Sequence, residues 1–201
     1  MKMATAPKVK PTLDFLAKWI RRKVEEAKEH KREPNVFWVT DLVRCDMKRS
    51  LELLLPPEIV SLFYIKPQII HGELVHAGTE AWFGVREEEV ERQLGPYKVR
   101  GRPDVWLKDE GTVVEIKVVR PEAKVPMDHH VLQLRIYMWL TGAKFGRLLY
   151  ITHEWIKEYT VEDPLTDEGV LGLIEDRRSP RYDWECDYCP YKSFCPLGGR
   201  K

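Results

Sequence analysis

The segment from Gly101 to Val119 carries two carboxylates and an ammonium group at a spacing suited to metal-dependent hydrolysis. Its sequence is GRPDVWLKDEGTVVEIKVV, which reads as two strands joined by a short turn. Glu115 and Lys117 lie two residues apart and therefore share one face of their strand. If the turn has two or four residues, the residue numbers of each cross-strand pair add up to 219. Asp104 then lies opposite Glu115. A three-residue turn with a bulge at Gly111 would stagger them by one.

Two carboxylates about 4 Å apart repel by roughly 4 kcal/mol at an effective dielectric constant near 20. A divalent cation would offset this repulsion, and carboxylate oxygens are ligands that Mg²⁺ and Mn²⁺ accept. The neighbouring ammonium of Lys117 could orient or deprotonate a water that attacks phosphorus. The pattern therefore indicates phosphodiester hydrolysis.

The alternative is a charged surface hairpin in which Asp104 and Glu115 pair with Lys117 and Arg102. The apolar run around Glu115 and Lys117, VVEIKVV, is typical of a central strand, where unpaired charges are costly. This context favours a functional site.

Three of the four cysteines, Cys186, Cys189 and Cys195, form a C-x2-C-x5-C pattern near the end of the chain, and Cys45 is a distant fourth. Four thiolates can hold Zn²⁺ or an iron-sulfur cluster, and the spacing alone does not separate the two. The alternative is a set of four unrelated buried thiols.

The composition favours one sizeable core. The chain has 201 residues, of which 43% are hydrophobic, and the positive charges of its 33 Lys and Arg nearly balance the negative charges of 32 Asp and Glu.

No apolar run approaches the roughly 20 residues that span a bilayer, and the beginning of the sequence lacks the apolar core of a signal peptide. We therefore expect a cytoplasmic protein without a membrane segment, and in that reducing compartment disulfides are disfavoured. A single Asn and three Gln among abundant charged residues indicate a thermophilic source.

These residues must be positioned by alternating helices and strands. Apolar periodicity predicts helices over residues 12–31, 66–83, 128–140 and 166–177, and another that begins after Thr40, carries Cys45 and turns Leu54 inward. Strands are predicted over 85–94, 97–107, 112–119, 147–152 and 155–161, of which the first three should be consecutive and antiparallel. The fold class is therefore α/β (α+β). Three segments are expected: helical residues 1–35, a core over 36–178 and a loop-built cysteine module over 179–201.

Four motifs in matching order resemble those of the RecB family of PD-(D/E)xK nucleases: GELVH, GRPD, EIK and QLRIY. The resemblance implies a restriction-endonuclease-type core with a central mixed sheet flanked by helices. It implies a metal site made by His76, Asp104, Glu115 and the backbone carbonyl of Ile116. It further implies that Lys117 is catalytic, and that Gln133 and Tyr137 position the DNA backbone. A histidine ligand favours Mn²⁺ over Mg²⁺, and His71 is the alternative histidine.

One cysteine before the nuclease core, in TDLVRC, and three after it resemble the iron-sulfur subgroup of this family, and specifically its CRISPR-associated exonucleases. The resemblance implies that Cys45, Cys186, Cys189 and Cys195 hold a cluster, with [4Fe-4S] favoured over [2Fe-2S], as a structural clasp. It implies hydrolysis of single-stranded DNA or DNA with overhangs, 5′ to 3′, during CRISPR spacer acquisition beside the integrase complex.

Two other functions are open at this point: an iron-sulfur nuclease of DNA repair or recombination, and a non-catalytic module that binds DNA or the integrase. A redox-active iron-sulfur protein is a more remote third. Oligomeric state is left open. Candidate phosphate contacts are the basic residues Lys18, Arg21, Arg22, Lys23, Arg100, Arg102, Lys124 and Arg135.

Overall fold

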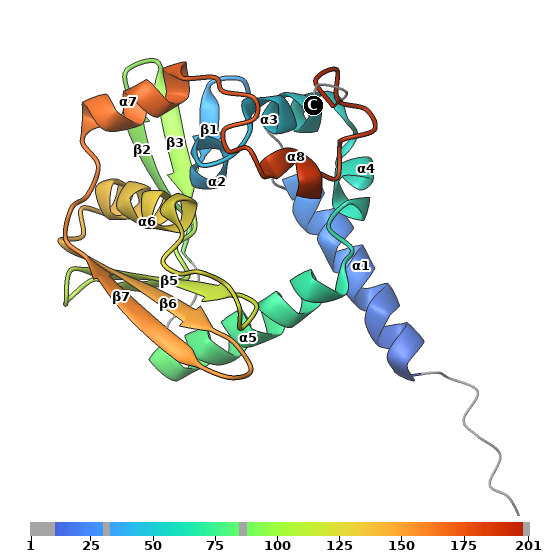
Figure 1. Ribbon diagram of the computed structural model, residues 1–201, viewed down its shortest axis with the longest axis horizontal. Helices are drawn as coiled ribbons and strands as arrows, with labels where there is room; N and C mark the ends of the chain where they lie inside the picture. Colours follow the sequence, from blue (N-terminus) through green and yellow to red (C-terminus); the bar gives the residue numbers. More distant parts are fainter. Residues whose placement is uncertain (1–10, 30–32, 85–87, 199–201) are drawn as a thin grey trace, which may run out of the picture.

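The computed structural model describes residues 11–29, 33–84 and 88–198, arranged as helices around two sheets (Figure 1). The helices are α1 (Pro11–Glu29), α2 (Val39–Leu42), α3 (Asp46–Leu54), α4 (Pro57–Leu62), α5 (Pro67–Phe83), α6 (Asp128–Thr141), α7 (Asp167–Glu175) and α8 (Glu185–Tyr188). The strands are β1 (Val36–Trp38), β2 (Val90–Leu94), β3 (Tyr97–Gly101), β4 (Val105–Leu107), β5 (Thr112–Val118), β6 (Phe145–Ile151) and β7 (Ile156–Val161). The expected α/β class is confirmed. No helix within the described ranges is long and apolar enough to cross a membrane.

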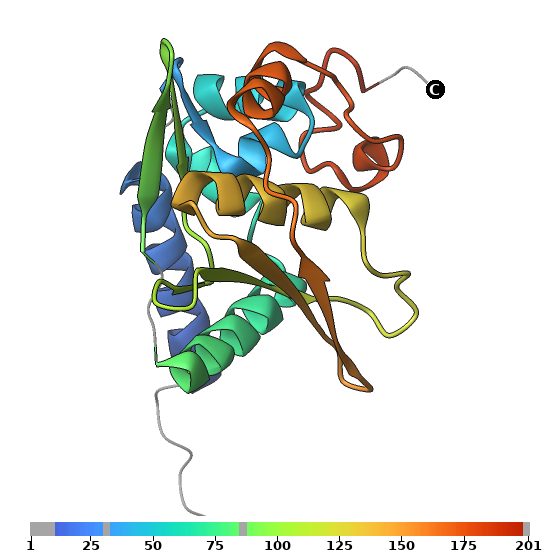
Figure 2. The same ribbon diagram turned by 90° about the vertical axis from the view of Figure 1, so that its left-hand side faces the viewer.

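The strands form two sheets, with the orders β1-β3-β2 and β4-β5-β6-β7. Each sheet is mixed, because β1 is parallel to β3 and β5 is parallel to β6, while the remaining pairs are antiparallel. Helix α6 lies between the two sheets and contacts both, as Figure 2 shows. A helix in that position needs apolar residues on all sides. Of the eight residues of α6 from Gln133 to Leu140, seven are buried and only Arg135 is partly exposed.

The predicted strand over residues 97–107 divides into β3 and β4, which belong to different sheets. Pro103 lies in the break and has no backbone N–H to donate to a ladder. Strand β3 ends at Gly101. A Cβ atom at this position would lie only 2.6 Å from the Tyr137 ring and 2.7 Å from the Val39 side chain. After the break the predicted register is confirmed: Val105 pairs with Val114 and Leu107 with Thr112, each pair summing to 219.

The helix expected after Thr40 is two short helices, and Cys45 lies between them as the residue that precedes α3. The expectation that Leu54 points inward is wrong, since its side chain is 79% exposed. The break at Cys45 changes the direction of the helix, so the apolar periodicity of one continuous helix does not carry across it.

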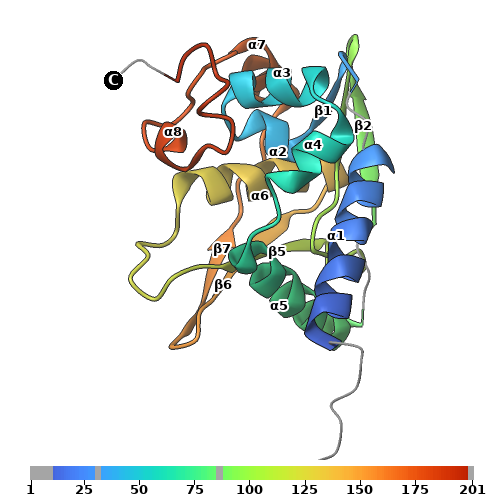
Figure 3. The ribbon, with the colours of Figure 1, turned by 90° about the vertical axis from the view of Figure 1, so that its right-hand side faces the viewer.

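The C-terminal tail packs back against this break. The backbone N–H of Asp46 donates to the carbonyl of Arg178 at 2.9 Å, and that of Met47 donates to the Ser179 hydroxyl at 2.8 Å. The Glu185 carboxylate accepts from the backbone N–H of Cys45 at 2.8 Å. Figure 3 shows the tail and α8 beside α3 and one end of α6.

Candidate active site and cysteine cluster

The hairpin formed by β4 and β5 brings the two predicted carboxylates into the interior. Asp104 precedes β4 directly and Glu115 lies on β5; their side chains are buried, and the residues are 6% and 2% exposed. The backbone N–H of Ile116 donates to Asp104 Oδ2 at 2.6 Å, which holds this carboxylate against the neighbouring strand. The arrangement agrees with the sequence prediction that Asp104 faces Glu115.

Lys117 links the hairpin to α6. Its Nζ atom donates to Glu115 Oε1 at 2.6 Å and to Gln133 Oε1 at 3.0 Å. Tyr137 lies one turn further along α6 and is also buried. Burial, with the nearby charges of Glu115 and Asp104, raises the pKa of Tyr137 well above its usual range, so its hydroxyl stays protonated. Gln133 and Tyr137 therefore lie beside the two carboxylates, where the family resemblance places them.

Helix α5 supplies the histidine. His76 Nδ1 lies 3.3 Å from Asp104 Oδ1, whereas His71 is exposed to solvent. Glu80, one turn after His76, completes a group in which one ligand atom each from His76, Glu80 and Asp104 lie within 4.8 Å of one another. The sequence reasoning missed Glu80. Its signal was present, because residues four apart on a helix share a face.

The electrostatics of the site favour a bound cation. Burial and the charge of Asp104 raise the pKa of Glu115 to about 7, although Lys117 opposes the rise. Burial lowers the pKa of His76, but the hydrogen bond to Asp104 and the charges of Asp104 and Glu115 outweigh this and raise it. Glu115 Oε2 is buried and has no hydrogen-bond partner among the described residues. A divalent cation fits here, since this oxygen could coordinate it and the cation would offset the negative charge of the two carboxylates.

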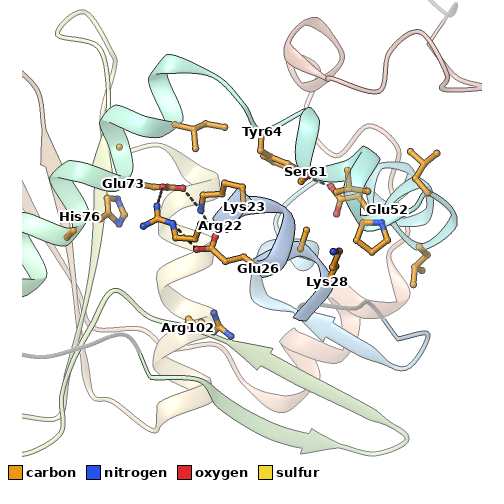
Figure 4. Close-up of a pocket in the computed structure, with 18 of the residues that line it drawn as sticks. Arg22, Lys23, Glu26, Lys28, Glu52, Ser61, Tyr64, Glu73, His76 and Arg102 are labelled. Atoms are coloured by element: carbon orange, nitrogen blue, oxygen red, sulfur yellow. Dashed lines mark hydrogen bonds and ion pairs between the residues drawn. The ribbon is translucent and has the colours of Figure 1, made fainter. Parts of the chain in front are cut away.

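A cavity of about 1110 Å³ opens beside His76 and Glu80, between α1, α4 and α5 (Figure 4). Several basic side chains reach it, but Arg22 and Lys23 both pair with Glu73 of α5. Arg102 lines the same cavity and pairs with Glu89 at 2.9 Å. Three of the eight predicted basic residues therefore lie near the site, and all three are already partnered by carboxylates.

The four cysteines converge around a second cavity, of about 390 Å³, between the Cys45 segment and the tail. All four are half-buried. Burial raises the pKa of Cys186, and the proximity of Cys45, Cys189 and Cys195 raises it further. Cys45 thus lies beside cysteines that are some 140 positions away in the sequence. This arrangement is expected when four cysteines bind one metal ion or one cluster together.

Comparison with known proteins agrees with this geometry. No family model matches the chain. A curated protein of Saccharolobus solfataricus, named CRISPR-associated exonuclease Cas4, is 35% identical over 193 residues, which cover 88% of this chain and 95% of that protein. A solved structure titled "Crystal structure of SSO0001" superposes with a TM-score of 0.83 at 35% identity, covering 92% of this chain and 96% of the other. Identity at this level over nearly the whole of both chains shows that this chain belongs to the family of CRISPR-associated Cas4 exonucleases.

Proposed function

We propose that this chain is a metal-dependent DNA exonuclease whose active site is formed by His76, Asp104, Glu115 and Lys117. The observation that carries the proposal is the buried pair of carboxylates with an unpartnered Glu115 oxygen, aligned with His76 on one side and Lys117 on the other. Family membership supports the exonuclease activity.

Asp104, Glu115, His76 and the Ile116 carbonyl would hold the cation, and we add Glu80 as a further candidate ligand. When bound, Mn²⁺ or Mg²⁺ supplies positive charge that polarises the phosphodiester and stabilises the leaving oxygen. Asp104 is positioned for this role because the Ile116 N–H holds one of its oxygens and leaves the other toward His76.

Lys117 would hold the attacking water or a phosphate oxygen. An ammonium has three N–H donors, and Glu115 and Gln133 accept two of them. The third donor is left for the substrate. Gln133 acts here as a positioning residue, since it fixes the direction of the Lys117 ammonium, and Tyr137 and Arg102 would contact the DNA backbone nearby.

We further propose that the substrate is single-stranded DNA or an overhang, that degradation runs 5′ to 3′, and that the reaction trims DNA for CRISPR spacer acquisition beside the integrase complex. The name of the Saccharolobus solfataricus relative supports the CRISPR context.

The cysteine site would hold an iron-sulfur cluster, as a clasp between the Cys45 segment and the module at 179–201. A tetrahedral Zn²⁺ site with bonds of about 2.3 Å needs sulfur atoms roughly 3.8 Å apart. No three of these sulfur atoms, all of which belong to described residues, lie within 4.8 Å of one another. This wider spacing favours a polynuclear cluster over a single Zn²⁺ ion, and the family resemblance favours [4Fe-4S] over [2Fe-2S].

The test is cleavage of end-labelled single-stranded DNA with Mn²⁺ by the wild type and by Glu115→Gln. We expect the variant to lose at least about 100-fold in rate, because a charged ligand of the cation is removed. Glu110→Gln is the matched control, since it removes an exposed carboxylate from the same hairpin. Equal rates for wild type and Glu115→Gln would contradict the proposal.

Strand polarity is read from the same gel with labels at either end. A 5′-labelled strand should release its label in the earliest products, whereas a 3′-labelled strand should shorten gradually. Circular single-stranded DNA should resist cleavage if a free end is needed.

A further inference from the structure

Three side chains of α1 converge on one carboxylate of α5. Trp19 Nε1 and Arg22 Nη2 each donate to Glu73 Oε2 at 2.8 Å, and Lys23 forms an ion pair with Glu73 Oε1. Figure 4 shows Arg22 and Lys23 directed at Glu73 from the neighbouring helix. We call Trp19, Arg22 and Lys23 the α1 donor set. A single anionic group therefore receives a guanidinium, an ammonium and an indole N–H.

The α1 donor set is partly removed from water. Trp19 is 6% exposed, and the Lys23 side chain is 19% exposed. An indole N–H can only donate, so this buried group needs an acceptor. Glu26 of the same helix also holds both cations, at 2.6 Å from Lys23 Nζ and 3.3 Å from Arg22 Nε. The three donors are thus fixed in position around an anion, which in the free chain is the Glu73 carboxylate.

The charged members of the set open on the cavity that contains two of the candidate metal ligands. Arg22 and Lys23 line this cavity together with His76 and Glu80. Glu73 precedes His76 by three residues, and residues three apart on a helix are neighbours, with Cβ atoms about 5 to 6 Å apart. Figure 4 shows the two side chains next to each other on α5. An anion held by the donor set would therefore lie within reach of the phosphate next to the one that is cut.

A phosphate of the DNA backbone can take the place of the Glu73 carboxylate. Both groups present negatively charged oxygens that accept from guanidinium and ammonium donors. The Glu73 side chain is 28% exposed, and partly exposed ion pairs are weak because water and salt screen them. The exchange of one anion for the other at this position therefore has a small free-energy cost.

We propose that Trp19, Arg22 and Lys23 bind the backbone phosphate next to the scissile phosphate, and that Glu73 occupies this position until DNA displaces it. The inference rests on the proposed function, because it takes the metal site beside His76 as the place of cleavage. Glu73 then weakens DNA binding, and its removal strengthens it. A contact that only fastened α1 to α5 would not have this sign, because its loss would loosen the wall of the cavity.

The experiment measures binding, by fluorescence anisotropy, of a labelled oligothymidylate to the full-length chain in the Glu115→Gln background, which preserves the probe. Glu73→Gln should lower the dissociation constant about 5-fold, because the competing ion pairs are removed. Asp14→Asn is the matched control, since it also removes one negative charge from α1. Asp14 pairs with Lys18 at 2.7 Å, and neither of these two described residues lines the cavity. This control should bind the probe as the background protein does.

The gain must depend on the two cations. When Arg22→Gln and Lys23→Gln are both present, Glu73→Gln should no longer tighten binding. Loss of both cations from the Glu73→Gln protein should also reduce the slope of log affinity against log salt concentration by about 0.7, the value for one phosphate contact on a single strand. Tightening that persists without Arg22 and Lys23 would overturn the proposal and assign the effect to overall charge.

A second variant covers the case in which Glu73→Gln loosens the fold, which its Tm reports. Glu26→Gln frees the same two cations but keeps the contact between α1 and Glu73, so it should tighten binding about 2-fold. Unchanged or weaker binding in the folded variants would overturn the proposal.

Wild-type cleavage with Mn²⁺ is assayed separately from binding. A chain that cleaves DNA but shows no gain from Glu73→Gln or Glu26→Gln would contradict this inference alone. A chain that shows the cation-dependent gain but does not cleave would contradict the proposed function and leave the phosphate site in place.

Discussion

Replacing Glu115 with glutamine should make the metal-free protein more stable at pH 8 while it removes activity. Burial and Asp104 raise the pKa of Glu115 from 4.5 to about 7, with the attraction of Lys117 already opposing the rise. The folded state therefore binds the proton more tightly than the unfolded state. The free energy of unfolding is highest below pH 4.5, falls as the pH rises toward 7, and is constant above it.

The magnitude follows from the same values. A tenfold change in a proton equilibrium corresponds to about 1.36 kcal/mol, so the charged Glu115 costs the folded state about 3 kcal/mol at pH 8 and less than about 1 kcal/mol at pH 5. Glutamine keeps the shape of the neutral acid and does not ionise. For a chain of this size, 3 kcal/mol corresponds to a rise in Tm of roughly 6 to 12 °C.

Thermal unfolding followed by far-ultraviolet circular dichroism, in chelator, measures this difference at pH 5 and pH 8. Glu110→Gln should match the wild type at both pH values, because its carboxylate is exposed. Addition of Mn²⁺ at 100 times its dissociation constant should stabilise the wild type by about 2.7 kcal/mol, and Glu115→Gln by much less. A Glu115→Gln protein no more stable than the wild type at pH 8 would refute the reasoning.

Three further changes have expected outcomes. Lys117→Met should lower kcat by about 10² to 10⁴ and leave stabilisation by Mn²⁺ intact, because Lys117 is no ligand; loss of that stabilisation would contradict this role. Gly101→Ala should destabilise the fold by about 1 to 3 kcal/mol in urea titration, since the new methyl group would crowd Tyr137, whereas Gly172→Ala, with open space around it, should not. Cys189→Ser should reduce visible absorption and lower Tm, and an unchanged iron content would argue against its role as a ligand.

The hairpin formed by β4 and β5 was the most predictable part of the candidate site. Its strands are adjacent in sequence, so only two registers were open, one for a turn of two or four residues and one for a bulged turn of three. The structure has the first, in which Val105 pairs with Val114 and Asp104 faces Glu115. Gln133 and Lys117 were also associated in advance, but only through the family resemblance. Their contact depends on how α6 packs on β5, which no local pattern contains.

Other features depended on tertiary structure and were missed. The division of residues 97–107 between two sheets follows from the close packing of Gly101 on α6, and the pattern of apolar residues continues through the break. Glu80 shares a helical face with His76, but Asp104 joins the two only because α5 packs against β5, and a glutamate on an apolar helix is otherwise unremarkable. Leu54 was misplaced because the chain turns at Cys45 to meet the tail.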